Sequence, residues 1–156
     1  MSIADQFLHK SLIQFKQHYD CQEAFFSELN QRLSTQGYVE ESYLSNIISR
    51  ENIYPTGLVT STINIAIPHT DPQHIKKPFI DITKLNSPLT FIEMGSTDKK
   101  VDVTWIFALG VTNGANQVEL LQKLMRLCSQ KTTINKLQSL TDIEEIYQFF
   151  SLNIDL

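Results

Sequence analysis

Residues 63–69 read Ile-Asn-Ile-Ala-Ile-Pro-His, and this short stretch decides the fold that we expect. Its isoleucines alternate with a polar and a small residue, which is the period of a β-strand that buries one face. Pro68 has no backbone N–H to donate to a neighbouring strand, so it ends the run. His69 follows directly. We therefore expect an apolar strand to carry an imidazole to its carboxyl end, the edge at which α/β sheets bind ligands.

Helical and strand patterns are mixed along the rest of the chain. Apolar residues at helical spacing predict helices over 21–36, 41–49 and 117–130, and a last helix that begins near Asp142. We expect Asp20 to cap the first helix and Gly37 to end it. β-Branched and aromatic runs predict further strands over 79–83 and 101–109, with shorter ones around 12–15 and 91–92. Turns or loops are expected at 52–61, 86–88 and 110–116.

This order of elements predicts the fold class. Helices come first, and strands and helices then alternate irregularly, which is typical of an α/β protein. We expect one domain over residues 1–156, with a mixed β-sheet flanked by helices on both faces.

The composition excludes several classes of protein. Hydrophobic residues make up 42% of the chain, charged residues 19%, and the formal net charge is −4. These values are typical of a globular protein and favour neither disorder nor a nucleic-acid partner. The first residues lack the basic start and apolar run of a signal peptide, and no later run is apolar enough to span a bilayer. We therefore expect a cytoplasmic protein.

His69 is the first candidate for chemistry. A neutral imidazole at a strand end can attack phosphorus as a nucleophile, although a structural histidine would fit the same position. His74 lies within reach of His69 in sequence, but no third ligand is evident, so we expect no metal site. We place His74 at the border of a partner-docking surface. Leu58 is either a core residue or a part of that surface.

Arg50 is the second candidate. It ends a short predicted helix, where its guanidinium would either complement the helix dipole or pair with Glu51. Alternatively, its planar fork would grip a phosphoryl group. Thr56 and Gly57 would then add a hydroxyl and a closely approaching backbone amide to the same phosphate site.

A longer pattern joins these candidates. Arg50-Glu51 is followed by Tyr-Pro-Thr-Gly-Leu at 54–58 and by Ile-Ala-Ile-Pro-His-Thr-Asp at 65–71. On this pattern the whole chain resembles the fructose/mannitol-type IIA components of the bacterial phosphoenolpyruvate-dependent sugar phosphotransferase system. The galactitol-specific IIA proteins look most similar, on residues 54–58, 68–74 and 116–121.

The resemblance implies a phosphotransferase component that needs no cofactor. His69 would be the catalytic nucleophile, Arg50 would stabilise the phosphoryl group, and Thr56 and Gln117 would add weaker polar contacts. Gln117 stands where the mannitol and fructose proteins have a second histidine, which the galactitol type also lacks. A glutamine amide can donate a hydrogen bond to phosphate but cannot take up a proton.

The same resemblance implies the partners. A histidine phosphocarrier protein would donate the phosphoryl group, and a cysteine of a cognate IIB component would accept it. The membrane IIC component, which recognises the sugar or sugar alcohol, would be an indirect partner. Two alternatives stay open. One is a nitrogen-type IIA regulatory module whose phosphorylation controls partner binding, and the other is an interaction domain in which His69 is inert.

Overall fold

The isoleucine run forms an inner strand of a five-stranded sheet, with the strand order β1-β4-β5-β3-β2. The structure is a computed structural model, and it describes residues 2–155. The sheet is mixed, because β1 is parallel to β4 and β3 is parallel to β5, whereas β4–β5 and β2–β3 are antiparallel. The strands are β1 (Leu8–Lys16), β2 (Gly57–Val59), β3 (Asn64–Ala66), β4 (Phe79–Ile92) and β5 (Lys100–Gly110).

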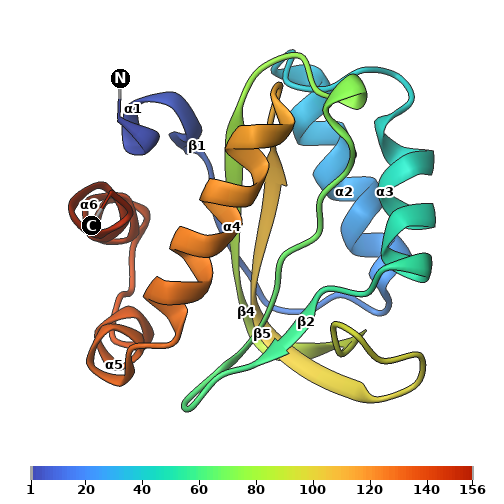
Figure 1. The fold of residues 1–156 in the computed structure, drawn as a ribbon. Helices are drawn as coiled ribbons and strands as arrows, with labels where there is room; N and C mark the ends of the chain where they lie inside the picture. The colour runs from blue at the N-terminus through green and yellow to red at the C-terminus, as the bar shows by residue number, and fades with distance from the viewer. Residues whose placement is uncertain (1, 156) are drawn as a thin grey trace.

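Helices cover both faces of this sheet, as predicted (Figure 1). One face carries α2 (Gln22–Thr35) and α3 (Tyr43–Ile53). The other carries α1 (Ile3–Phe7), α4 (Gly114–Cys128), α5 (Lys131–Gln138) and α6 (Ile143–Asn153). Across residues 2–155, no helix has the length and apolar character needed to cross a membrane.

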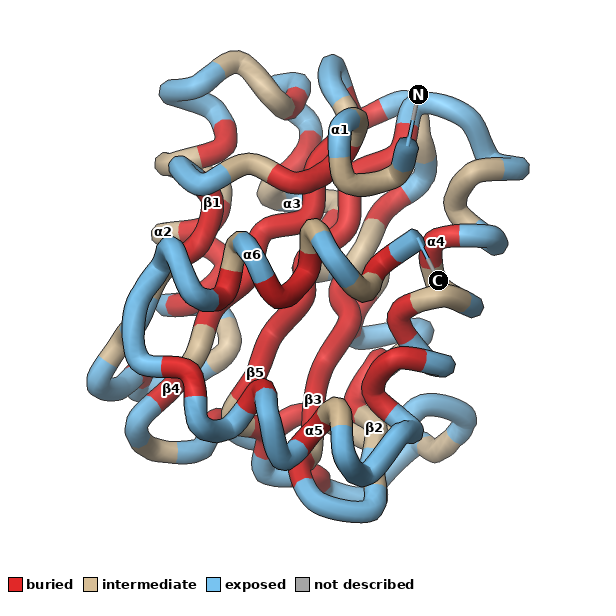
Figure 2. The backbone as a smooth tube through the Cα atoms, turned by 90° about the vertical axis from the view of Figure 1, so that its left-hand side faces the viewer, coloured by how far each residue is buried: buried red, intermediate tan, exposed pale blue. Residues whose placement is uncertain are grey.

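The alternation of side chains along β5 builds two separate cores. Trp105, Phe107 and Leu109 pack into the cluster under α4, α5 and α6. Ile106 and Ala108 point the other way and pack under α2 and α3. Figure 2 shows the inner strands as continuously buried between exposed helix surfaces. Successive side chains of a strand point to opposite faces, so both cores depend on one register.

The turn predicted at 86–88 is wrong. β4 runs without interruption from Phe79 to Ile92, and the residues predicted as a separate strand at 91–92 are its far end. Its pairing with β5 shifts register between Lys84 and Leu89. Pro88, which cannot donate a ladder hydrogen bond, lies inside this irregularity, and Ser87 N donates to Gln17 O of the chain leading out of β1. A local irregularity in the pairing therefore accommodates residues that normally mark a turn.

Several element boundaries also differ from the prediction. Asp20 does not cap α2, because Cys21 is the N-cap and Asp20 instead accepts a hydrogen bond from His18. Gly37 ends this helix as expected, with a left-handed φ of 78°. The helix predicted over 41–49 forms as α3 but extends to Ile53, and α5 and the short strand β2 have no counterpart in the prediction.

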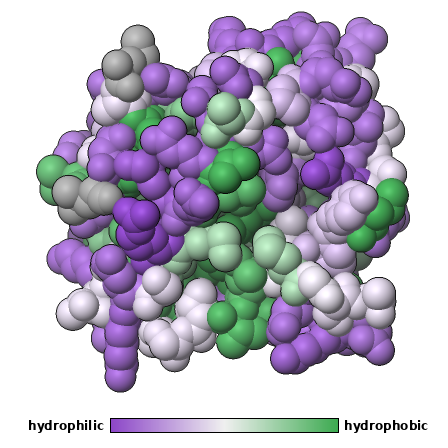
Figure 3. All heavy atoms as spheres, in the orientation of Figure 1, coloured by the Kyte–Doolittle hydropathy of each residue, from purple (hydrophilic) through white to green (hydrophobic). Residues whose placement is uncertain are grey.

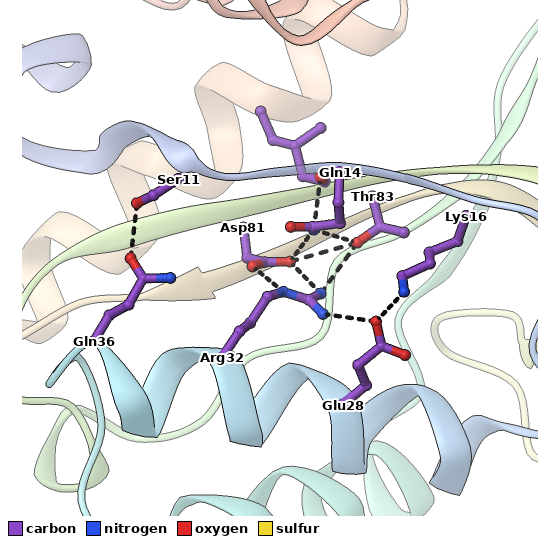
Figure 4. A network of polar contacts seen from close by, with 9 residues as sticks. Ser11, Gln14, Lys16, Glu28, Arg32, Gln36, Asp81 and Thr83 are labelled. Carbon is purple, nitrogen blue, oxygen red and sulfur yellow. Dashed lines mark hydrogen bonds and ion pairs between the residues drawn. The ribbon is translucent and has the colours of Figure 1, made fainter.

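A buried ion pair attaches α2 to the sheet (Figure 4). Arg32 donates from Nε and Nη2 to the two carboxylate oxygens of Asp81 in β4, both at 2.8 Å. Gln14 of β1 donates to the same carboxylate at 2.8 Å. Asp81 is fully buried, and a buried charge is tolerated only when it is paired and hydrogen-bonded. The network therefore fixes α2 on β1 and β4. Neither of these strands lies next to β3, because β5 lies between β4 and β3.

Candidate functional site

His69 lies just past the end of β3, beside the last residues of β5. Pro68 O accepts a hydrogen bond from Leu109 N at 3.0 Å, and His69 forms an isolated parallel bridge with Leu109. The sequence prediction that an apolar strand presents His69 at its carboxyl end is confirmed. Hydrogen bonding to β5 continues past the proline, and it holds the backbone that bears the imidazole.

The imidazole of His69 is held in one tautomer. Its Nδ1 lies 2.7 Å from the carbonyl oxygen of Ile67. A carbonyl oxygen can only accept, so Nδ1 carries the hydrogen and Nε2 carries the lone pair. Within residues 2–155, no hydrogen bond involves Nε2. The ring therefore offers one unengaged nucleophilic nitrogen.

The surroundings of His69 also favour its neutral form. Burial lowers the pKa of His69 below its usual 6.5, and the positive charge of Arg50 lowers it further. The hydrogen bond to Ile67 and the carboxylate of Asp71 raise that pKa but do not outweigh burial. A neutral imidazole has the lone pair that nucleophilic attack on phosphorus requires.

Arg50 lies in the last turn of α3 and is paired with Asp71. Its Nη1 donates to Asp71 Oδ1 at 2.7 Å, and its guanidinium lies 5.0 Å from the ring centroid of Tyr54. Its Nε is buried and has no hydrogen-bond partner in the described part of the chain. Arg50 does not pair with Glu51, which was one of the alternatives that the sequence left open. The site therefore holds a guanidinium whose buried Nε donor is unused.

Thr56 faces the interior instead of an open phosphate site. It is 3% exposed, and its hydroxyl donates to Glu51 Oε1 at 2.8 Å while accepting from Ile67 N at 3.2 Å. The hydroxyl hydrogen is therefore already used within the protein. A direct contact of Thr56 with a phosphoryl group stays a prediction, and in this structure Thr56 holds the strand that leads to His69.

Gln117 lies in the first turn of α4, the helix that follows the end of β5. Its side chain is half-buried and makes no hydrogen bond among residues 2–155. The side-chain amide of Gln117 is thus unengaged at the start of α4. The strand before this helix is β5, and Leu109 near its end forms the bridge with His69. A direct contact between Gln117 and a phosphoryl group stays a prediction.

The two residues predicted for a partner surface differ in position. His74 is 7% exposed, and its Nδ1 is hydrogen-bonded to Ser42 Oγ at 2.7 Å. Its place at the border of a docking surface stays a prediction. Leu58 is half-buried and lines a pocket of about 280 Å³ between β2 and α4, together with Val59 and Met125. Figure 3 shows apolar side chains gathered in the middle of this side of the molecule.

Two acidic residues that contact the site residues are absent from the sequence predictions. Asp71 follows His69 by two positions and was quoted in the motif without a function, although an acid so close to a candidate nucleophile was a usable signal. Glu51 was considered only as a partner of Arg50. No sequence pattern indicates that it bonds to Thr56. Among the described residues, no group of three or more His, Cys, Asp or Glu could hold a metal ion.

The fold and the site together define an α/β domain with a largely buried imidazole just past the end of an inner strand and a guanidinium whose charge acts on it. A family model described as "Phosphoenolpyruvate-dependent sugar phosphotransferase system, EIIA 2" matches residues 6–153, and the chain belongs to this family. The resemblance stated from the motifs is thereby confirmed. The chain is a phosphotransferase component of the kind that relays phosphoryl groups in sugar uptake.

Curated and solved relatives agree with this assignment. The chain is 27% identical over 131 residues to the galactitol-specific EIIA component of Escherichia coli strain K12, which covers 83% of this chain and 87% of that protein. It resembles the nitrogen regulatory protein IIA-Ntr of Neisseria meningitidis, with a TM-score of 0.75, 24% identity and coverage of 94% and 97%. It also resembles the mannitol IIA of Escherichia coli in complex with phosphorylated mannitol IIB, with a TM-score of 0.72, 20% identity and coverage of 92% and 96%. At these identities, the two solved structures establish a shared fold.

Proposed function

We propose that this protein carries a phosphoryl group on Nε2 of His69 during uptake of a sugar or sugar alcohol. The observation that carries the proposal is the hydrogen bond from Nδ1 to Ile67 O at 2.7 Å, which leaves the Nε2 lone pair free. Burial keeps the ring neutral, so this lone pair is present at neutral pH. Phosphoryl transfer needs positioning and charge stabilisation more than further covalent chemistry, so a site with few groups suffices.

The transfer consists of two displacements at phosphorus. In the first, the Nε2 lone pair of His69 forms a bond to phosphorus as the N–P bond of the donor's phosphohistidine breaks, and its electron pair returns to the donor's imidazole. In the second, a cysteine thiolate of the acceptor attacks the same phosphorus, and the pair of the Nε2–P bond returns to His69. Nδ1 keeps its hydrogen throughout, and its bond to Ile67 O stabilises the positive charge on the phosphorylated ring.

Arg50 is the group best placed to stabilise the phosphoryl oxygens. Its unpartnered Nε and its paired Nη1 belong to a planar fork that matches phosphate geometry. Charge-assisted hydrogen bonds to the oxygens would strengthen as negative charge spreads over them in the transition state. Gln117 would add a neutral donor from the start of α4.

The partners follow from the family and from one relative. A histidine phosphocarrier protein is the proposed donor, and a cysteine of a IIB component is the proposed acceptor. The complex of mannitol IIA with phosphorylated mannitol IIB supports the second assignment. The galactitol-specific relative supports a sugar alcohol as the transported molecule. The likeness to a nitrogen regulatory protein is one of fold, so it does not favour the regulatory alternative.

Intact-mass analysis tests the proposal. The wild type and His69→Gln are incubated with phosphoenolpyruvate, enzyme I and the histidine phosphocarrier protein. We expect an acid-labile gain of one phosphoryl group on the wild type only. No gain on a folded wild type, with a known IIA protein as positive control, would overturn the carrier function. A gain on both proteins would place the phosphoryl group elsewhere.

A further inference from the structure

Glu51 is a buried carboxyl group without a cationic partner. It is 4% exposed, and no ion pair among the described residues includes it. Both of its oxygens are used on one residue, because Oε2 accepts from Thr56 N at 2.7 Å and Oε1 accepts from the Thr56 hydroxyl at 2.8 Å. Burying a carboxyl group costs free energy even when it is hydrogen-bonded. Its presence here calls for a structural or functional reason.

The hydrogen bonds continue from Thr56 to the nucleophile. The Ile67 amide donates to Thr56, to Oγ1 at 3.2 Å and to the carbonyl oxygen at 3.3 Å. The Ile67 carbonyl in turn accepts from His69 Nδ1 at 2.7 Å. Ile67 is therefore fixed at its amide by Thr56, and its carbonyl fixes the imidazole. The connection runs from Glu51 through Thr56 and Ile67 to His69.

From this connection we propose that Glu51 is a positioning residue for phosphoryl transfer, which holds His69 in the Nδ1–H tautomer through Thr56 and Ile67. The kinetic part of this proposal rests on the carrier function proposed above, whereas the tautomer part does not. Glu51 touches no reacting atom, and it acts by fixing the carbonyl that receives the ring hydrogen.

The place of Glu51 in α3 explains why the anchor belongs there. Arg50 and Glu51 are consecutive in the last turn of α3, so their side chains leave the helix in directions about 100° apart. Arg50 is directed to Asp71, which lies two residues past His69, and Glu51 is directed to Thr56. One helix end therefore positions both the guanidinium and the strand that bears the nucleophile. Their relative geometry does not depend on two independently mobile segments.

The bonds suit the carboxylate form of Glu51, which predominates above its raised pKa of about 7. Two donors of Thr56 point at the Glu51 side chain, and a carboxylate can accept from both. A glutamine at this position has one accepting oxygen and one donating nitrogen, so one donor of Thr56 would lose its acceptor. A valine at position 56 would keep the shape of threonine but lose the hydroxyl that receives the Ile67 amide.

Nitrogen NMR of the unphosphorylated protein tests the tautomer. Protein labelled with ¹⁵N-histidine is compared as wild type, Glu51→Gln and, as a matched control, Glu41→Gln, which changes an exposed glutamate just before α3. We expect the wild type and the control to show the Nδ1–H tautomer of His69. In Glu51→Gln we expect a several-fold rise in the Nε2–H fraction. A folded Glu51→Gln protein with the wild-type tautomer ratio would overturn the proposal.

The pair Thr56→Val and Thr56→Ser tests the next bond of the same chain, and it decides the matter if Glu51→Gln does not fold. Valine should shift the tautomer as Glu51→Gln does, whereas serine keeps the hydroxyl and should keep the Nδ1–H form. Equal spectra for the two variants would contradict the proposal.

A kinetic measurement then connects positioning to transfer. The rate of phosphoryl uptake from the phosphorylated histidine phosphocarrier protein should fall on the order of tenfold in Glu51→Gln, because misplacing a reacting group by a fraction of an ångström is costly. The concentration of donor at half-maximal rate should stay unchanged. A wild type that takes up no phosphoryl group would refute the carrier function, and the NMR result would still decide the tautomer. If the wild type is phosphorylated and Glu51→Gln has the same uptake rate and the same tautomer ratio, the positioning role of Glu51 is refuted and the carrier function stands.

Discussion

Arg50 Nη1 donates to Asp71 Oδ1 at 2.7 Å, so the guanidinium whose charge acts on His69 is already paired in the unphosphorylated protein. The two residues are 21 positions apart in sequence and meet because the end of α3 lies beside the segment that follows β3. An arriving phosphoryl group would therefore either share Arg50 with the carboxylate of Asp71 or displace that carboxylate from Arg50. This pairing makes Arg50 and Asp71 separately testable.

Replacing Arg50 by alanine should slow phosphoryl uptake by about 10²–10³-fold, the usual cost of removing one preorganised donor from a developing charge. Rapid-quench measurement of uptake from the phosphorylated donor gives the rate. Lys136→Ala, which removes an exposed cation of α5, is the control for general loss of charge. A normal rate in a folded Arg50→Ala protein would show that Arg50 does not stabilise the phosphoryl group.

Replacing Asp71 by asparagine should lower the pKa of His69. The carboxylate of Asp71 raises that pKa, and in the variant the charge of Arg50 would act on the ring without a counter-charge. An NMR titration of the His69 ring measures the shift. Asp98→Asn, at an exposed loop position, should leave the titration unchanged. An increase of the pKa in Asp71→Asn would contradict the pairing described above.

The pH profile of phosphoryl uptake should have its acid limb below pH 6.5. The pKa of His69 is lowered from that value by burial, and only the protonated ring lacks the lone pair. The midpoint of the decline in uptake should therefore lie below pH 6.5. The profile is measured from initial rates with preformed phosphorylated donor at saturating concentration. A decline that begins well above pH 6.5 would mean that His69 is not protected from protonation.

Glu51 should make the protein less stable as pH rises from 4.5 to about 7. Burial raises its pKa from 4.5 to about 7, so in this range the folded state holds a proton that the unfolded state has released. Stability from this group is fully present below pH 4.5 and is lost as pH rises through the folded pKa, by roughly 3 kcal/mol in all. Urea unfolding at a series of pH values measures the effect. The wild type should show this slope more strongly than Glu51→Gln, and parallel curves would refute it.

Gly110→Ala should destabilise the protein by about 1–3 kcal/mol, because overpacking a filled core shifts side chains and backbone. A Cβ at Gly110 would lie 2.1 Å from Cε2 of Phe79, a ring that is fully buried. Gly114→Ala is the matched control, since a Cβ there meets nothing within 4 Å and alanine favours the start of α4. Thermal unfolding of the two variants gives the comparison. Equal melting temperatures would show that Phe79 can move aside without cost.

The features predicted correctly depend on local spacing. The period of two at 63–67, the proline after it and the apolar run at 101–109 place β3, β5 and His69 without knowledge of their neighbours. The turn predicted at 86–88 failed because long-range pairing with β5, with a shift of register between Lys84 and Leu89, overrides the local preference of Ser87 and Pro88. Likewise, Thr56 was assigned to the phosphate because its hydroxyl is chemically suitable, and only packing shows that it points to Glu51.

The sequence by itself determined that an apolar strand delivers His69 to a sheet edge and that Arg50 lies at a helix end, because both follow from side-chain period and backbone chemistry over a few residues. The tertiary structure decided which nitrogen of His69 is free, that Asp71 pairs with Arg50, and that Glu51 reaches Thr56. A hydrogen bond requires two groups within about 3 Å in a suitable direction. Where these groups come from different elements, as Arg50 and Asp71 do, only the approach of the end of α3 to the segment that follows β3 brings them together.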